Sequence, residues 1–264
     1  MSESIRREEM CGAIQRAVES SPDVFAMCEL GSTAMGRSDA LSDLDILLLV
    51  ADGSVERVFA AAEAGLRELA PLRHRHADPE PAWHGHSRRH YQLEGAGEHL
   101  KIDLLLQQLG TRGGLRLLQS ELHGVPVVIF NKLGRPVLEP VDWTTHRGRM
   151  QAKLAEIRAN YQVYGNLPFK ELTRGRLSDA IHFGTSQILR PLVDLLRMRH
   201  DPRHFDWGMR YLDSDLPREV HARLVPLFFS ADAQALLAHL TEARGWLESE
   251  LAEIDVDAID LGEE

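Results

Sequence analysis

Residues 30–48 read LGSTAMGRSDALSDLDILL, and this stretch decides how the first half of the chain is interpreted. It begins at the end of a hydrophobic segment, continues through a Gly-Ser turn and a polar loop, and ends in an apolar run. Residues 44–50 have the length and composition of a central strand that is covered on both faces. Asp43 and Asp45 are two positions apart, and alternate residues of a strand point to the same face. The two carboxylates therefore project into one site.

The residues around this pair suit the binding of a metal and a phosphate. Mg²⁺ prefers oxygen ligands and is commonly held by one or two carboxylates together with substrate phosphates. Gly31 has no side chain, so a phosphate can approach its backbone closely. Ser32 adds a hydroxyl, and the amides that follow it form a phosphate cradle if they begin a helix. Arg37 is a candidate for contacting a triphosphate, with simple solvation as the alternative.

The Gly-Ser pair, ten intervening residues and the Asp-Leu-Asp triplet resemble the signature of the DNA polymerase β-type nucleotidyltransferase superfamily. In that superfamily a third carboxylate comes from a later strand. We choose Asp103, because it lies in an apolar strand-like segment where a carboxylate is costly without a metal or hydrogen bonds. Glu94 and Glu98, in the same predicted hairpin, remain the alternatives.

The resemblance implies in-line attack by an acceptor hydroxyl on the α-phosphate of a nucleoside triphosphate, with release of pyrophosphate. Two Mg²⁺ ions would take part. The implied catalytic and metal-binding residues are Asp43, Asp45 and Asp103. The candidates for binding the nucleotide are Gly31, Ser32 and Arg37.

The hydrophobic pattern predicts an α+β fold, in which a small mixed β-sheet domain flanked by helices precedes an all-helical C-terminal domain. We expect helices at residues 6–20, 55–69 and 114–122, and strands at residues 24–30, 44–50, 90–93, 99–106 and 125–130. Residues 90–93 and 99–106, joined by a glycine-containing connection, form a candidate hairpin. Residues 72–89 are expected to be irregular. The pattern is helical from residue 145 to about residue 254, so we place the catalytic domain at 1–140 and the helical domain at 141–264.

A small catalytic domain followed by a helical domain also resembles bacterial lincosamide and aminoglycoside nucleotidyltransferases. This resemblance implies that the helical domain helps to form the acceptor pocket. Phe205, Trp207 and Tyr211 could line such a pocket or belong to the core. Glu171 and Asp179 are secondary candidates for contacting the acceptor or acting as a base.

Five histidines lie between residues 74 and 90, and they raise the question of a zinc site. Their spacing matches no compact set of zinc ligands, so a surface loop is the favoured interpretation. The histidines are His74, His76, His84, His86 and His90.

The bulk composition is that of an ordinary folded protein, with 44% hydrophobic and 27% charged residues among 264. The net charge of -10 argues against a dedicated nucleic-acid binder and favours a cationic acceptor. No apolar run approaches the roughly 20 residues of a membrane-spanning helix, and the N-terminus lacks the apolar stretch of a signal peptide. We therefore expect no membrane association and a cytoplasmic location.

The leading hypothesis from sequence is magnesium-dependent transfer of a nucleoside monophosphate, AMP first, to a hydroxyl of a small molecule such as an aminoglycoside or lincosamide antibiotic. One alternative is nucleotidylation of a protein or RNA in a toxin-antitoxin-like system. Another is a catalytically silent, nucleotide-binding regulator. The sequence leaves open the base of the nucleotide, the acceptor and its modified hydroxyl, the general base and the oligomeric state.

Overall fold

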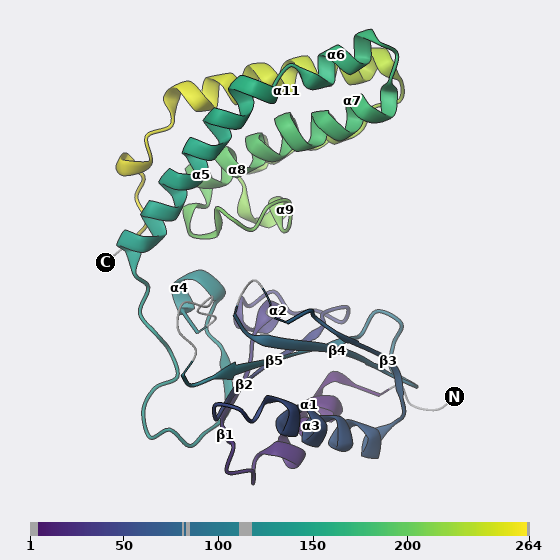
Figure 1. The fold of residues 1–264 in the computed structure, drawn as a ribbon, viewed down its shortest axis with the longest axis vertical. Helices are drawn as coiled ribbons and strands as arrows, with labels where there is room; N and C mark the ends of the chain where they lie inside the picture. Colours follow the sequence, from purple (N-terminus) through teal and green to yellow (C-terminus); the bar gives the residue numbers. More distant parts are fainter. Residues whose placement is uncertain (1–4, 81, 83–84, 111–117, 263–264) are drawn as a thin grey trace. The chain divides into compact units, whose positions relative to one another are not determined.

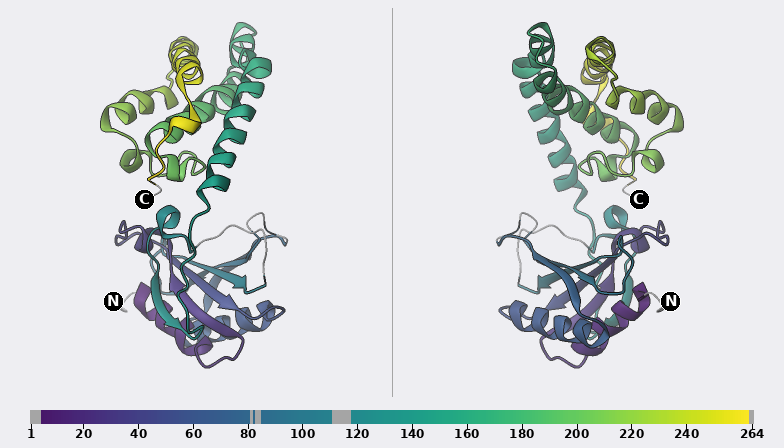
Figure 2. Two further views of the ribbon diagram at one scale, coloured as in Figure 1. Left: turned by 90° about the vertical axis from the view of Figure 1, so that its left-hand side faces the viewer. Right: turned by 90° about the vertical axis from the view of Figure 1, so that its right-hand side faces the viewer.

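The computed structural model describes residues 5–80, 82, 85–110 and 118–262. The chain divides into two compact units, Met1–Val141 and Asp142–Glu264. The first unit carries a mixed β-sheet with helices and the second is helical, which confirms the predicted α+β class (Figures 1 and 2). Within the described residues, no helix is both long enough and apolar enough to cross a membrane.

The sheet of the first unit has six strands in the order β3-β4-β5-β2-β1-β6. The central pair, β2 with β5, is parallel, and every other neighbouring pair is antiparallel. The strands are β1 Val24–Glu29, β2 Leu44–Val50, β3 Leu72–Ala77, β4 Ser87–Leu93, β5 Ile102–Gln108 and β6 Val127–Asn131.

The two longer helices of the first unit, α1 (Arg7–Val18) and α3 (Val55–Leu69), lie on the same side of this sheet (Figure 1). They meet closely at Gly65, where an added Cβ would be 2.6 Å from the Cβ of Ala17. Ile46 and the other even-numbered residues of β2 pack with these helices. The odd-numbered Leu47 belongs to a separate cluster, because neighbouring residues of a strand point to opposite faces. Asp45 therefore lies on the face of the sheet away from α1 and α3.

The structure corrects the prediction that residues 72–89 are irregular. Leu72–Ala77 forms the edge strand β3, and β4 begins at Ser87. Five of the six residues of β3 are exposed, so the apolar signal that marks a buried strand is missing. Arginine and histidine side chains on an exposed edge are a known way of protecting it from pairing with other chains.

Two smaller predictions are also corrected or limited. A bulge between Val24 and Ala26 puts Val24 in the core beside α1 and α3, whereas Ala26 joins the opposite cluster. Strict alternation over residues 24–30 predicted that Val24 and Ala26 lie on the same side of the strand.

Of the helix predicted at residues 114–122, residues 114–117 lie outside the described residues. Helix α4 is the short Ser120–His123, and the small helix α2 spans Gly31–Ala34.

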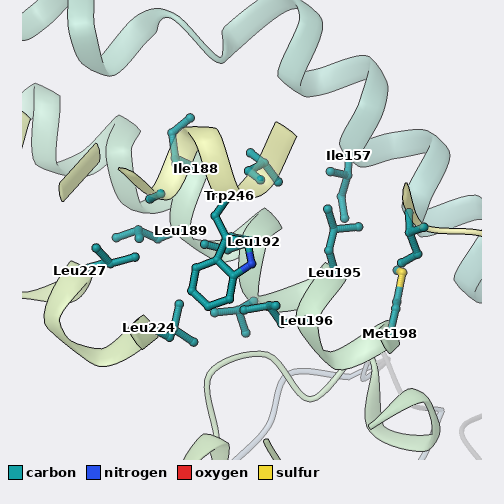
Figure 3. Close-up of a cluster of buried hydrophobic side chains, with 14 of the residues drawn as sticks. Ile157, Ile188, Leu189, Leu192, Leu195, Leu196, Met198, Leu224, Leu227 and Trp246 are labelled. Atoms are coloured by element: carbon teal, nitrogen blue, oxygen red, sulfur yellow. The ribbon is translucent and has the colours of Figure 1, made fainter. Parts of the chain in front are cut away.

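The second unit is a helical bundle around one hydrophobic core. Its longer helices are α5 (Trp143–Tyr164), α8 (Arg190–His200) and α11 (Ala233–Glu253). Figure 3 shows the ring of Trp246 from α11 close to Leu192 and Leu196 of α8. Shorter elements complete the bundle: α6 Leu167–Thr173, α7 Leu177–Gly184, the π-helix η1 Thr185–Leu189, η2 Pro202–His204, α9 Leu212–Asp215, α10 Arg218–Leu224, η3 Val225–Phe228 and η4 Val256–Ala258.

Candidate active site

The parallel pairing of the two central strands brings two of the predicted carboxylates together. Asp45 of β2 is the direct register partner of Asp103 of β5. Residues in register on neighbouring strands project to the same face, and their side chains are adjacent. Asp103 is 9% exposed and Asp45 is half-buried. The alternatives Glu94 and Glu98 are both exposed.

Asp43 is linked to this pair through Lys101, which sequence reasoning did not single out. The Nζ atom of Lys101 lies 2.9 Å from Oδ2 of Asp43 and 3.0 Å from Oδ2 of Asp103. The ammonium group thus bridges two of the three carboxylates. Among the described residues, no three His, Cys, Asp or Glu side chains form a ready-made metal cluster. A metal ion between Asp43 and Asp103 would have to displace the Lys101 ammonium.

Burial of these acids changes the protonation of Asp45. Desolvation, followed by repulsion from Asp103, raises the pKa of Asp45 to about 6. Lys101 acts in the opposite direction, but it does not cancel the effect of burial. A carboxylate that is this poorly solvated has an unsatisfied demand for positive charge. Carboxylate oxygens are the donors that a hard divalent cation prefers.

Gly31 lies directly against the Asp45 carboxylate. An added Cβ at Gly31 would be 1.9 Å from Oδ2 of Asp45, and the φ angle of Gly31 is +60°. The backbone N–H of Leu30 donates to the Asp45 carbonyl oxygen over 2.9 Å, which fixes the end of β1 beside the start of β2. Only glycine meets both demands at this position, because any side chain would collide with the acid.

The loop after Gly31 forms a tight turn. Its helix α2 is a single turn, shorter than the phosphate-cradling helix considered from sequence. The Oγ atom of Ser32 is buried and has no hydrogen-bond partner among the described residues. The backbone N–H of Arg37 donates to the Ser32 carbonyl oxygen over 2.8 Å and closes the loop. Asp39 stabilises the next turn, since its Oδ1 accepts from the Leu41 amide and the Ser42 hydroxyl, each at 2.9 Å.

Arg7 fastens the same loop from α1, and sequence reasoning missed it. Its guanidinium donates to the carboxylate of Glu29, to Oγ1 of Thr33 at 2.5 Å and to Oγ of Ser38 at 2.6 Å. Thr33 in turn donates to Glu29 over 2.7 Å. These contacts tie both ends of the Gly-Ser loop to the last residue of β1. A lone arginine in the first turn of a helix gave no sequence signal for this role.

Replacing Arg7 by alanine is expected to loosen the loop and to weaken nucleotide binding about tenfold. One charged hydrogen-bond partner of a partly buried carboxylate is worth about 1.5–3 kcal/mol, of which binding senses a part. The measurement is titration of the protein with Mg·ATP by calorimetry. Arg6→Ala is the matched control, because the neighbouring Arg6 is exposed and pairs only with Glu9 in the described ion pairs. Equal affinities for the two variants would contradict the assignment.

The histidine-rich segment is not the surface loop that its spacing favoured. His74 and His76 lie on β3 and His90 on β4, whereas His86 is buried and His84 lies outside the described residues. His90 is in register with Asp103, and its Nδ1 contacts the Oδ1 atom of that carboxylate. The register of the predicted hairpin, which pairs His90 with Asp103, was the sequence signal from which this contact could have been predicted.

Glu171 and Asp179, the acidic candidates for contacting the acceptor, differ from each other in burial. Glu171 is buried, and its carboxylate accepts from Arg174 at 2.8 Å and from Arg176 at 3.3 Å. These ion pairs give it a structural role at the turn between α6 and α7. Asp179 and His182 are exposed on α7.

A cavity of about 450 Å³ opens within the helical unit, between α5, the π-helix η1 and α8. It is large enough for a small molecule. Asp194 lines it, and burial raises the pKa of this carboxyl although Lys153 Nζ lies 3.5 Å away. Gly208 and Met209 complete one side. Of the three aromatic residues that could line a pocket or belong to the core, Phe205 belongs to the core of the helical unit.

Neither a family model nor a curated protein matches the chain. Solved structures do match. An aminoglycoside 6-adenyltransferase from Bacillus subtilis has 13% identity and a TM-score of 0.31 over 94% of this chain and 90% of its own. A spectinomycin adenyltransferase from Enterococcus faecialis, solved with ATP and spectinomycin, has 11% identity and a TM-score of 0.39 over 93% and 99%. A nucleotidyltransferase-like protein from Exiguobacterium sibiricum has 14% identity and a TM-score of 0.36 over 93% and 76%.

The TM-scores of these structures are all below 0.5, so no function passes from them to this chain.

Proposed function

We propose that this protein is a magnesium-dependent nucleotidyltransferase that transfers a nucleoside monophosphate, with ATP as the first donor to test, to a hydroxyl of a small molecule. The observation that carries the proposal is the direct register pairing of Asp45 with Asp103, with the side-chain-free Gly31 against the Asp45 carboxylate. A buried and a half-buried acid beside a backbone that a ligand can approach are the groups that a cation and a phosphate would need.

The donor set of this chain fits the proposed metal. Asp43, Asp45 and Asp103 supply carboxylate oxygens, and the raised pKa of Asp45 reflects burial that a cation would relieve. The ammonium of Lys101, held between Asp43 and Asp103, already marks a place that favours positive charge. When bound, Mg²⁺ would supply Lewis-acid polarisation of the phosphate and lower the pKa of the attacking hydroxyl.

The transfer itself is an exchange of one P–O bond for another. The acceptor oxygen forms a bond to the α-phosphorus, the bond from this phosphorus to the bridging oxygen of the β-phosphate breaks, and pyrophosphate leaves with the electron pair. The hydroxyl proton is released to water. The buried hydroxyl of Ser32 lacks a hydrogen-bond partner among the described residues, which supports a role for it as a donor to a phosphate oxygen.

The acceptor class is inferred from charge and from the helical unit. A net charge of -10 attracts a cationic molecule and repels a polyanionic one. The cavity is lined by two acids, Glu156 and the half-buried Asp194, by two cations, Lys153 and Arg190, and by neutral hydrogen-bonding groups that include Asn160 and Gln187. We therefore propose a hydroxylated amine as the acceptor, an antibiotic of the aminoglycoside type being the first to test, with the helical unit contributing to its binding.

The direct test supplies Mg²⁺, each nucleoside triphosphate in turn and a panel of hydroxylated antibiotics, and detects nucleotide-monophosphate adducts by mass spectrometry. We expect an adduct and pyrophosphate with at least one panel member. If pyrophosphate is released and the adduct is found on protein or RNA, the acceptor is that macromolecule and not a small molecule. If the protein neither forms an adduct nor binds Mg-nucleotide, the proposed function is wrong.

Asp194→Asn is expected to raise the KM for the acceptor about tenfold while changing kcat less than twofold. The substitution keeps the shape of the side chain but removes the charge that would pair with an ammonium group, a contact of about 1.5–3 kcal/mol. Initial rates at varied acceptor and fixed ATP measure the effect. Asp213→Asn is the control, because Asp213 is an exposed acid of the same unit. An unchanged KM for the acceptor in Asp194→Asn would exclude the cavity as its binding site.

A further inference from the structure

A row of polar side chains crosses four strands of the sheet, and its outer part has no role in the function proposed above. His76 of β3 is in register with His90 of β4, His90 with Asp103 of β5, and Asp103 with Asp45 of β2. Register partners share a face, so the row lies on the face of the sheet that carries Asp45. The rings of His76 and His90 stack, with their centroids 5.7 Å apart.

His90 connects two carboxylates. Its Nδ1 contacts Oδ1 of Asp103, and its Nε2 lies 3.1 Å from Oδ1 of Asp78. Each ring nitrogen thus faces a carboxylate oxygen, and the ring bridges the two acids. The ring is 22% exposed, and the carboxylates on its two sides are 13% and 16% exposed, which keeps competing water scarce.

Asp78 is itself held in place from the other side. Nε of Arg88, on the same strand as His90, donates to Oδ2 of Asp78 over 2.7 Å. Burial acts to raise the pKa of Asp78, but the hydrogen bonds from Arg88 and His90 outweigh it and leave the pKa lowered. Asp78 is therefore a fixed anion that orients the His90 ring.

The two oxygens of Asp103 have different partners. Oδ1 is taken by His90, whereas Oδ2 is contacted by Lys101, the cation shared with Asp43. The ring thus fixes the rotation of the carboxylate and turns Oδ2 toward the side where the other acids lie. Without this contact, the Lys101 ammonium would be the one remaining partner of the carboxylate among the described side-chain contacts.

We propose that His90, oriented by Asp78, is the positioning residue of Asp103, which it holds with one oxygen directed at the proposed metal-nucleotide site. This inference rests on the proposed function and adds an outer layer to it. Hydrogen-bond partners of metal ligands typically contribute about 10–100-fold to metal affinity or activity.

The experiment measures the binding of Mn²⁺, used as a paramagnetic probe of the site, in the presence of a non-hydrolysable ATP analogue. We expect His90→Ala to weaken Mn²⁺ binding about 10–100-fold. His90→Asn should recover most of the affinity, because its amide nitrogen can take the place of Nδ1 as the donor to Asp103. Affinity for the analogue without metal should stay within about twofold, since His90 does not contact the Gly-Ser loop in the described contacts.

Two further variants separate positioning from a general loss of structure. Asp78→Asn should weaken Mn²⁺ binding in the wild-type background and add nothing in the His90→Ala background, because Asp78 acts through the ring. His74→Ala, a change at an exposed histidine on β3, should bind Mn²⁺ like the wild type. Thermal midpoints of all variants identify any that fail to fold, and the asparagine variants then carry the test.

The outcomes distinguish this inference from the function on which it rests. Wild-type protein that binds neither Mn²⁺ nor the analogue overturns the proposed function and the role of His90 together. Wild-type binding with an unchanged affinity in His90→Ala overturns the role of His90 alone. A His90→Asn variant as weak as His90→Ala also contradicts it, because the restored donor would then have no effect.

Discussion

Asp45→Asn should reduce nucleotidyl transfer by at least about a thousandfold while making the metal-free protein more stable. The loss follows from the central place of Asp45, beside Asp103 and against Gly31, in the proposed metal site. Loss of a metal's charge stabilisation in a transition state costs several kcal/mol, and each 1.36 kcal/mol corresponds to a factor of ten in rate. The measurement is kcat/KM for pyrophosphate release at saturating Mg²⁺.

Asp39→Asn is the matched control for this variant. Asp39 is an exposed acid of the same loop, and asparagine can keep its hydrogen bonds to the backbone of the turn. Its rate should stay within about twofold of the wild type. If Asp45→Asn and Asp39→Asn lose the same activity, general disturbance of the loop explains the effect and the metal-binding role is wrong.

The gain in stability has a defined dependence on pH. Burial and the neighbouring Asp103 raise the pKa of Asp45 from 3.8 to about 6 in the folded protein. Between these values the folded state binds more protons than the unfolded state, so the free energy of unfolding falls as pH rises from about 4 to about 6. Above pH 6 the ionised Asp45 carboxylate lowers the free energy of unfolding by its full amount, about 1–3 kcal/mol for a pKa shift of this size.

Asparagine at position 45 carries no charge, so the variant lacks the destabilisation that the ionised Asp45 carboxylate causes. The free energy of unfolding of Asp45→Asn should therefore exceed that of the wild type by about 1–3 kcal/mol at pH 7.5, and the difference should vanish near pH 4. Urea unfolding of the metal-free proteins at several pH values measures it. A difference that is constant with pH would show that Asp45 titrates normally.

Gly31→Ala is the second variant for which we expect a large effect, a loss of about a hundredfold or more in kcat/KM. The added Cβ would lie 1.9 Å from Oδ2 of Asp45, a distance that real atoms do not tolerate, so the carboxylate or the turn must move. A displacement of about 1 Å in a catalytic group can cost a factor of about 10² in rate. The φ angle of +60° adds about 1–2 kcal/mol of backbone strain to the folded state.

Gly36→Ala separates the strain from the collision. Gly36 lies in the same loop with a φ angle of +66°, yet an added Cβ there meets nothing within 4 Å. It should lower the free energy of unfolding by about 1–2 kcal/mol, like the strain part of Gly31→Ala, but leave kcat/KM within a few-fold. If the two alanine variants lose equal activity, contact between Gly31 and Asp45 has no part in the function.

Much of the site could be read from the sequence because its signals are local. Gly31, Ser32, Asp43 and Asp45 lie close together in the chain, although β2 begins at Leu44 and so contains only the second of the two aspartates. The apolar run of β2 also revealed a central strand. The edge strand β3 was not predicted, because most of its residues are exposed and it therefore lacks the hydrophobic pattern of a buried strand.

The sequence by itself determined the α+β class, the Gly-Ser turn and the position of Asp45 in the apolar β2 segment, all of which depend on residues close in the chain. Only the tertiary structure decided that Asp103 lies beside Asp45 and that His90 contacts Asp103. The same holds for the loop contacts of Arg7, which come from α1. Such contacts join residues distant in sequence, and strand order and register, which set them, are fixed by the packing of the whole sheet.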